Sequence, residues 1–245
     1  MRGHLTPAQG WLRLPPNPDG DVAVKPAAYL PVYEEVLGSL RRRPFALLEL
    51  GIWRGTSLAL WRDAFPRATI VGVDLVTPGL QLGPRVHIVA GDQSDPDVFN
   101  RARAAHAPEG FDVIIDDASH VGRMSARSIQ ALYASHLKPG GLYIIEDWGT
   151  GYMETWADGA EPSAIIGTAE LDKSAVAETG ELLDERRLPS HDAGLVGLVK
   201  RLVDHVAAGT LTALHPGWVA NPVQIEWMRV HDGLVILKKP KELDA

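Results

Sequence analysis

The sequence contains no cysteine, which excludes disulfide bonds, a thiolate nucleophile and any cysteine-ligated metal. This agrees with a cytoplasmic protein, where disulfides are rare. Positive charge is also scarce, since 24 lysines and arginines face 31 aspartates and glutamates and the formal net charge is -7. Because the chain has no basic tail, we expect neither non-specific nucleic-acid binding nor attachment to an anionic membrane.

Long apolar runs are missing as well. The N-terminus, MRGHLTPAQGW, lacks the apolar core of a signal peptide, and no run reaches membrane-spanning length. The 245 residues are 45% hydrophobic, which predicts a single globular domain over residues 1–245. Residues 1–24 are rich in proline and glycine and predict an irregular arm. Residues 149–190 are glycine-rich and long for a connection, which predicts a lid or acceptor-binding insert.

Two continuous apolar runs, typical of parallel strands buried on both faces, each end in a pair of acidic residues. They are Val113–Ile115 before Asp116-Asp117, and Leu142–Ile145 before Glu146-Asp147. Open α/β sheets bind ligands at the carboxyl ends of their strands, so Asp117, Glu146 and Asp147 are expected to converge there with His120. An all-oxygen set suits Mg²⁺. The alternative is that these residues are ordinary strand-end acids.

A glycine-containing turn follows the first predicted strand, Phe45–Leu50. Strand, turn at Gly51 and helix form the arrangement of nucleotide-binding sites, because glycine lets a ligand approach the backbone and the helix N-terminus offers free N–H groups. Trp53 stands where the dinucleotide pattern has its second glycine. The second strand, Ala68–Val73, ends in Asp74, at about the separation from Gly51 that is used to bind ribose hydroxyls. A turn acid is the alternative for Asp74.

The third predicted strand, Val86–Ala90, leads into a polar cluster. Ser94 or Asp95 is expected to cap the helix that follows. Asp92 and Gln93 either belong to this capping turn or reach an adenine edge at the same rim, and both interpretations stay open.

The remaining elements follow from helical spacing and turn signals. We expect helices from Pro26 toward Leu40, Leu58 to Phe65, Pro96 to His106, Arg123 to His136, and Ser190 to Ala208 with Leu195, Leu198, Val199, Leu202 and Val203 inward. In the first of these, Tyr29 and Tyr33 either pack on the domain or contact substrate. Pro139-Gly140-Gly141 is expected to precede the fifth strand. Asp232-Gly233 lies between two extended runs and predicts a terminal hairpin.

These features together resemble the class I S-adenosylmethionine-dependent methyltransferases. Within that class, the segments IDDASH, IEDW, GDQSDP and SHDAGLVGLVKRLVD resemble the metal-dependent sugar O-methyltransferases of antibiotic biosynthesis, of the macrocin and mycinamicin type, with the cephalosporin-hydroxylase-like proteins as relatives. The resemblance implies a Rossmann-like α/β fold with a mostly parallel seven-stranded sheet and a C-terminal antiparallel hairpin. It implies S-adenosyl-L-methionine and Mg²⁺ as cofactors, a glycosylated natural product as acceptor, and a homo-oligomer.

The resemblance also implies roles for individual residues. Asp117, Glu146 and Asp147 match the Mg²⁺ ligands, His120 the general base, Glu49, Gly51 and Ser57 the cofactor loop, Asp74 the ribose-binding acid, and Asp92 and Gln93 the adenine end. His191, at a helix start, is a second candidate for the base. A sugar hydroxyl is a poor nucleophile, so a Lewis acid and a base with a pKa near the working pH would both be needed.

Three other functions stay open. A metal-dependent O-methyltransferase of a catechol or phenol needs the same fold and cation. A nicotinamide-dependent oxidoreductase also uses a glycine turn and an acid, although the glycine spacing here and the terminal hairpin argue against it. A cofactor-binding module without catalysis is the third.

Overall fold

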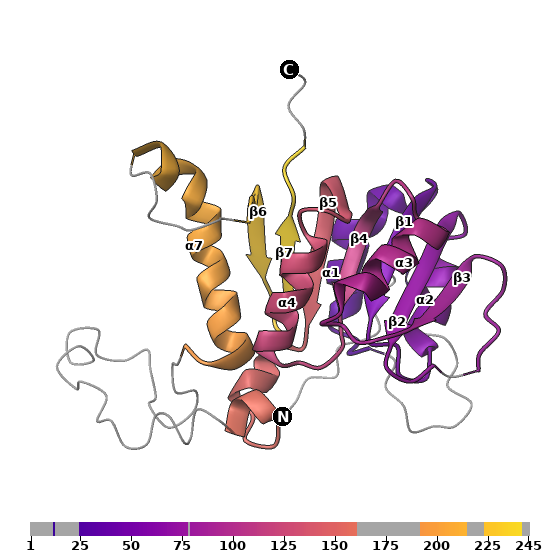
Figure 1. Cartoon of the computed structure of the whole chain (residues 1–245), viewed down its shortest axis with the longest axis horizontal. Helices are drawn as coiled ribbons and strands as arrows, with labels where there is room; N and C mark the ends of the chain where they lie inside the picture. The colour runs from indigo at the N-terminus through magenta and orange to yellow at the C-terminus, as the bar shows by residue number, and fades with distance from the viewer. Residues whose placement is uncertain (1–11, 13–24, 78, 161–191, 215–222, 242–245) are drawn as a thin grey trace.

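A computed structural model of the chain describes residue 12 and residues 25–77, 79–160, 192–214 and 223–241. A seven-stranded sheet in the order β3-β2-β1-β4-β5-β7-β6 forms its centre (Figure 1). The strands are β1 Phe45–Leu50, β2 Ala68–Asp74, β3 Val86–Ala90, β4 Phe111–Asp116, β5 Leu137–Glu146, β6 Trp227–Val230 and β7 Leu234–Lys238. The first five strands are parallel, and β7 is antiparallel to both β5 and β6. The predicted fold class and the terminal hairpin are therefore confirmed.

The register of the parallel strands aligns their carboxyl ends. Leu50 at the end of β1 pairs with Val73 of β2 on one side and with Asp116 of β4 on the other. Asp116 in turn pairs with Ile145 of β5. The residues that follow these positions consequently share one rim of the sheet, which contains the glycine turn and both acidic pairs.

Helices cover the two faces of the sheet. They are α1 Tyr29–Leu37, α2 Thr56–Ala64, α3 Pro96–His106, α4 Gly122–Leu132 and α7 Gly194–Leu214, with a 3₁₀ helix η2 at Trp148–Tyr152. The helices α1 and α2 pack with alternate strand residues such as Leu47 into one apolar cluster. The helices α3, α4 and α7 pack with the intervening residues, such as Leu48, into the other. In Figure 1, α7 stands beside β6 at one end of the sheet.

Three predicted details are wrong. The Pro139-Gly140-Gly141 segment lies inside β5, which already pairs at Leu137 with Phe111, and a register shift absorbs the irregularity. The helix before it ends at Leu132 rather than His136. Val203 is 55% exposed, because α7 packs through the narrower stripe that includes Leu195 and Leu202.

Some predictions fall outside the described residues, namely Ser190, His191 and most of the arm and insert. Leu12, from the arm, is described and buried beside α1, where its N–H donates to Glu34 at 2.6 Å. Across the described ranges, no helix combines the length and apolar character needed to cross a membrane.

Candidate active site

The glycine turn after β1 and the acid after β2 hold each other in place. Gly51 has φ +80°, and a Cβ there would lie 2.2 Å from the carbonyl oxygen of Asp117, so this position requires glycine. Asp74 Oδ2 accepts hydrogen bonds from the backbone N–H groups of Ile52 at 2.8 Å and Trp53 at 3.0 Å. The carboxylate expected to bind ribose therefore also fixes the turn beside it.

A hollow of about 180 Å³ lies at the ends of β2 and β3, and its walls include Asp74, Asp92 and Gln93. Asp92 accepts a hydrogen bond from the Ser94 N–H at 2.7 Å, which lowers the pKa of its carboxyl group. Asp95, which follows Ser94, caps α3 by accepting a hydrogen bond from the N–H of Asp97 at 3.0 Å. Of the two predicted capping residues, Ser94 and Asp95, the structure therefore confirms Asp95. The hollow therefore has an acidic rim, and the bond from the Ser94 N–H orients the Asp92 carboxylate.

Gln93 is buried and has structural partners as well as a place in this hollow. Its amide nitrogen donates to Asp116 Oδ1 at 3.2 Å and to Ser128 Oγ at 3.1 Å, while its amide oxygen accepts from the Ser119 N–H at 3.0 Å. Gln93 therefore ties the loop after β4, which carries the predicted metal ligand and base, to the loop after β3.

A buried lysine that the sequence analysis missed lies among three carboxylates. Lys25 Nζ is 2.7 Å from Glu146 Oε1, 2.9 Å from Asp117 Oδ2 and 3.2 Å from Glu49 Oε1, and its side chain is 1% exposed. Burial raises the pKa of Glu49, and it raises the pKa of Glu146 to about 8 even though the Lys25 ammonium opposes the shift. Because Lys25 lies more than 20 residues before Glu49, no local motif identified it.

Two tyrosines of α1 also bond to the predicted metal ligands. Tyr33 donates its hydroxyl proton to Glu146 Oε1, and Tyr29 donates to Asp147 Oδ1. Burial, together with the neighbouring acids, raises the pKa of both phenols, so both remain donors. Of the two predicted alternatives, packing is confirmed, since both tyrosines are buried in the apolar cluster of α1 and α2, and their hydroxyl groups also orient the carboxylates.

The predicted base lies between two acids. His120 Nε2 is 3.9 Å from Asp117 Oδ1 and 3.9 Å from Asp147 Oδ2. His120 and Asp147 have positive φ values of 53° and 55°, as does Trp53 of the glycine turn with 42°. Such conformations are uncommon for non-glycine residues and gather at functional sites. In the part of the chain that the structure describes, these three cases all lie at this rim.

The predicted metal ligands fall into two neighbouring groups that share Asp117. One group is Asp117, His120 and Asp147, and the other is Glu49, Asp117 and Glu146, with ligand atoms in each within 4.8 Å of one another. Lys25 contacts every carboxylate of the second group. Carboxylates outnumber the single ammonium in these two groups, and carboxylate oxygens are ligands that a hard divalent cation prefers.

A larger cavity of about 730 Å³ opens onto these groups. Its walls include Lys25, Ser57, Asp117, His120, Glu146 and Asp147, together with Trp156 from the segment after η2. The cavity and the smaller hollow share Gly51, Asp74 and Ala118 as wall residues, so they adjoin each other at this rim. Glu49 lies behind the wall, where it accepts a hydrogen bond from Ser57 Oγ at 2.7 Å.

Comparison with known proteins relates the chain to a group of enzymes. The chain is 32% identical over 181 residues to mycinamicin VI 2''-O-methyltransferase of Micromonospora griseorubida, a match that covers 71% of the chain and 44% of the relative. It is 32% identical over 183 residues to demethylmacrocin O-methyltransferase of Streptomyces fradiae, which covers 71% and 45% respectively. No protein-family model matches the chain.

Among solved structures, the MycE methyltransferase of the mycinamycin biosynthetic pathway in complex with Mg and SAH superposes with a TM-score of 0.65 and 27% identity. That match covers 87% of this chain and 50% of the other. The chain thus spans about half the length of the relatives that it matches. In sequence and in fold, the chain is a homologue of the macrocin and mycinamicin sugar O-methyltransferases.

Proposed function

We propose that this protein is an S-adenosylmethionine- and Mg²⁺-dependent O-methyltransferase that methylates a sugar hydroxyl of a glycosylated natural product. The observation that carries the proposal is the position of His120. Its Nε2 atom faces one oxygen each of Asp117 and Asp147, on the wall of a cavity that adjoins the hollow beside Asp74. A histidine, an acidic cluster and the hollow beside Asp74 therefore lie together at one rim of the sheet.

Asp117, Glu146 and Asp147 are the residues that would hold Mg²⁺. Their side chains are oriented before any ion binds, since Lys25 contacts Asp117 and Glu146 while Tyr29 donates to Asp147. When bound, Mg²⁺ supplies a Lewis acid that lowers the pKa of an acceptor hydroxyl. The excess of carboxylates over cations is the property of this site that favours such an ion.

The hollow beside Asp74 would hold the adenosine part of the methyl donor. Asp74 would accept hydrogen bonds from the ribose hydroxyls, while Asp92 and Gln93, which line the same hollow, would face the adenine end. Gly51 allows close approach to the backbone, and Ser57, which Glu49 fixes, lies farther along the wall. S-adenosylmethionine supplies the methyl group on a sulfonium and leaves as S-adenosylhomocysteine.

His120 would accept the proton of the attacking hydroxyl at Nε2. The imidazolium that forms would face Asp117 and Asp147, whose carboxylates stabilise a positive charge at this position. The same two acids would also orient the His120 ring toward the attacking hydroxyl, and such orientation lowers the barrier of the transfer.

Ligand binding tests the cofactor assignment first. We expect S-adenosylhomocysteine, measured by calorimetry and thermal melting with Mg²⁺, to bind and stabilise the protein, and NAD to do neither. Binding of NAD alone would contradict the proposal.

A methyl-transfer assay then offers mycinamicin VI, demethylmacrocin and catechol as acceptors and detects the product by mass. Transfer to a glycoside is the expected result, whereas transfer to catechol alone would move the function to a phenol O-methyltransferase. His120→Ala should abolish transfer and leave the affinity for S-adenosylhomocysteine nearly unchanged; undiminished transfer would refute the base assignment. Association into a homo-oligomer stays a prediction.

A further inference from the structure

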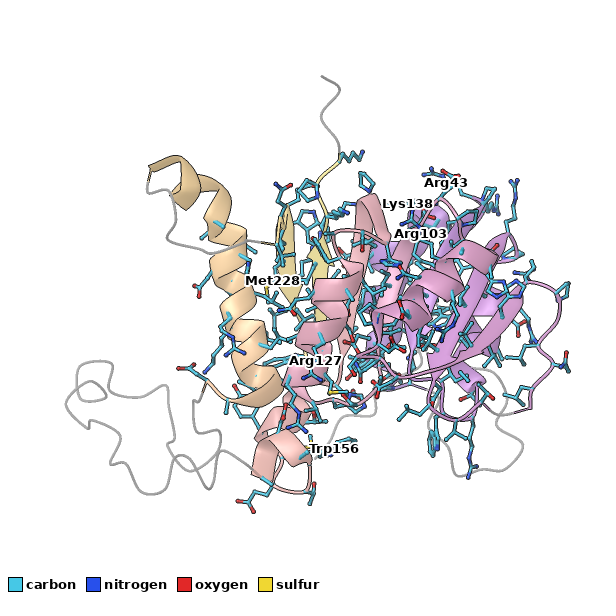
Figure 2. The ribbon with its side chains drawn as sticks, in the orientation of Figure 1. Arg43, Arg103, Arg127, Lys138, Trp156 and Met228 are labelled. Atoms are coloured by element: carbon cyan, nitrogen blue, oxygen red, sulfur yellow. The ribbon has the colours of Figure 1, made fainter. Side chains whose placement is uncertain are left out.

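Trp156 is an exposed aromatic residue on the wall of the catalytic cavity. It lies in the segment after η2, at the rim of the sheet where β5 ends, and Figure 2 labels it at the opposite edge of the molecule from Lys138 at the start of β5. Its side chain stays 40% exposed although tryptophan carries one of the largest apolar surfaces. The indole therefore offers the cavity an apolar face close to its acidic groups, on walls that also include Ile52, Trp53 and Val76.

The indole is held against the predicted base. The rings of Trp156 and His120 have centroids 5.1 Å apart and planes at 81°, an edge-to-face contact. An edge-to-face contact covers less of a ring than stacking does, which agrees with the 40% exposure of Trp156. A molecule resting on the exposed part of Trp156 would therefore lie beside His120, whose Nε2 atom faces Asp117 and Asp147.

The backbone that carries Trp156 is fixed by a shared carboxylate. Asp158 is 3% exposed, and its Oδ2 accepts from the N–H of Gly122 at 2.6 Å and from the N–H of Leu195 at 2.6 Å. These two N–H groups belong to the first turns of α4 and α7, where a negative charge is stabilised. Because Gly122 is two residues after His120, one carboxylate sets the positions of the base and of the indole.

We propose that Trp156 is the residue on which the sugar ring of the acceptor stacks. A pyranose has a face of C–H groups, which carry partial positive charge, and a rim of hydroxyls. The C–H face suits the negative face of an indole, and the hydroxyl rim suits the acids and His120 alongside. This inference rests on the proposed function, which it deepens by assigning a residue that determines the acceptor class.

The test compares Trp156→Ala and Trp156→Phe with Met153→Ala. Met153 is a matched control, because it lies in the same segment, is 51% exposed and does not line the cavity. With mycinamicin VI or demethylmacrocin as the acceptor, we expect Trp156→Ala to raise KM about tenfold and change kcat by less than about threefold. The Phe variant should recover most of the loss, and Met153→Ala should leave both constants nearly unchanged.

Calorimetry with the same acceptors, in the presence of S-adenosylhomocysteine and Mg²⁺, should show a matching loss of affinity in Trp156→Ala. A fall in kcat at unchanged KM and affinity would overturn the inference and make Trp156 a positioning residue for His120. An Ala variant equal to wild type would also overturn it. Binding of S-adenosylhomocysteine separates the two failures, since its absence from the wild type refutes the proposed function itself.

Discussion

Removal of the buried ammonium of Lys25 tests how strongly this charge stabilises the carboxylates around it. The Lys25→Met variant keeps the length and packing of the side chain but leaves Glu49, Asp117 and Glu146 without their shared cation. Loss of one partner from a buried ion pair costs about 3–5 kcal/mol, because the remaining charges stay buried without compensation. For a domain of this size each kcal/mol lowers Tm by roughly 2–4 °C, so Tm should fall by about 6–20 °C without Mg²⁺.

Lys200→Met is the matched control for this experiment. Lys200 makes a surface ion pair with Asp192 at 3.6 Å, and the two side chains are 38% and 91% exposed. Pairs of this kind contribute at most about 1 kcal/mol, so the control should change Tm by no more than about 4 °C.

A second substitution distinguishes charge from packing. In the Lys25→Met background, Glu49→Gln removes one of the three carboxyl groups that face the missing ammonium, so it should restore part of the lost Tm. Mg²⁺ should likewise stabilise Lys25→Met more than it stabilises the wild type, since the ion then supplies positive charge to the cluster. Differential scanning calorimetry with EDTA or with Mg²⁺ measures both effects. A loss of Tm no larger than that of Lys200→Met, or no recovery with Glu49→Gln, would refute the reasoning.

Three further predictions concern the same rim. Burial raises the pKa of Glu146 from 4.5 to about 8, so the folded protein without metal holds a proton that the unfolded chain releases. The free energy of unfolding of the protein, measured by urea melts in EDTA, should therefore fall as pH rises from about 5 to about 8 and then level off. A Glu146→Gln variant whose free energy of unfolding falls with pH at the same slope would contradict this. Gly233→Ala would place a Cβ 1.8 Å from the Tyr29 hydroxyl, so the Mg²⁺ dissociation constant should rise about tenfold, whereas Gly83→Ala, also at a positive φ but with nothing within 4 Å, should leave it unchanged. Asp117→Asn should raise the Mg²⁺ concentration needed for half-maximal methyl transfer by about tenfold or more, and an unchanged requirement would remove Asp117 from the ligand set.

Local pattern was sufficient for most of the elements. The runs at Phe45–Leu50 and Val86–Ala90 are mostly apolar and end at turn residues, and their predicted and observed strand bounds coincide. The Asp232-Gly233 turn predicted the hairpin for the same reason, since a turn is determined by neighbouring residues. The sequence pattern gave wrong predictions where strand pairing or helix packing determines the structure, as at the start of β5 and at Val203.

The sequence by itself determined that acids follow consecutive strands, and the parallel topology was enough to predict that they meet. Only the tertiary structure decided how they are oriented, because the partners come from distant segments. Lys25 precedes α1, Tyr29 and Tyr33 lie on α1, and Trp156 follows β5, yet all contact the same rim. No sequence spacing encodes these contacts, since they arise when the helices close onto the edge of the sheet.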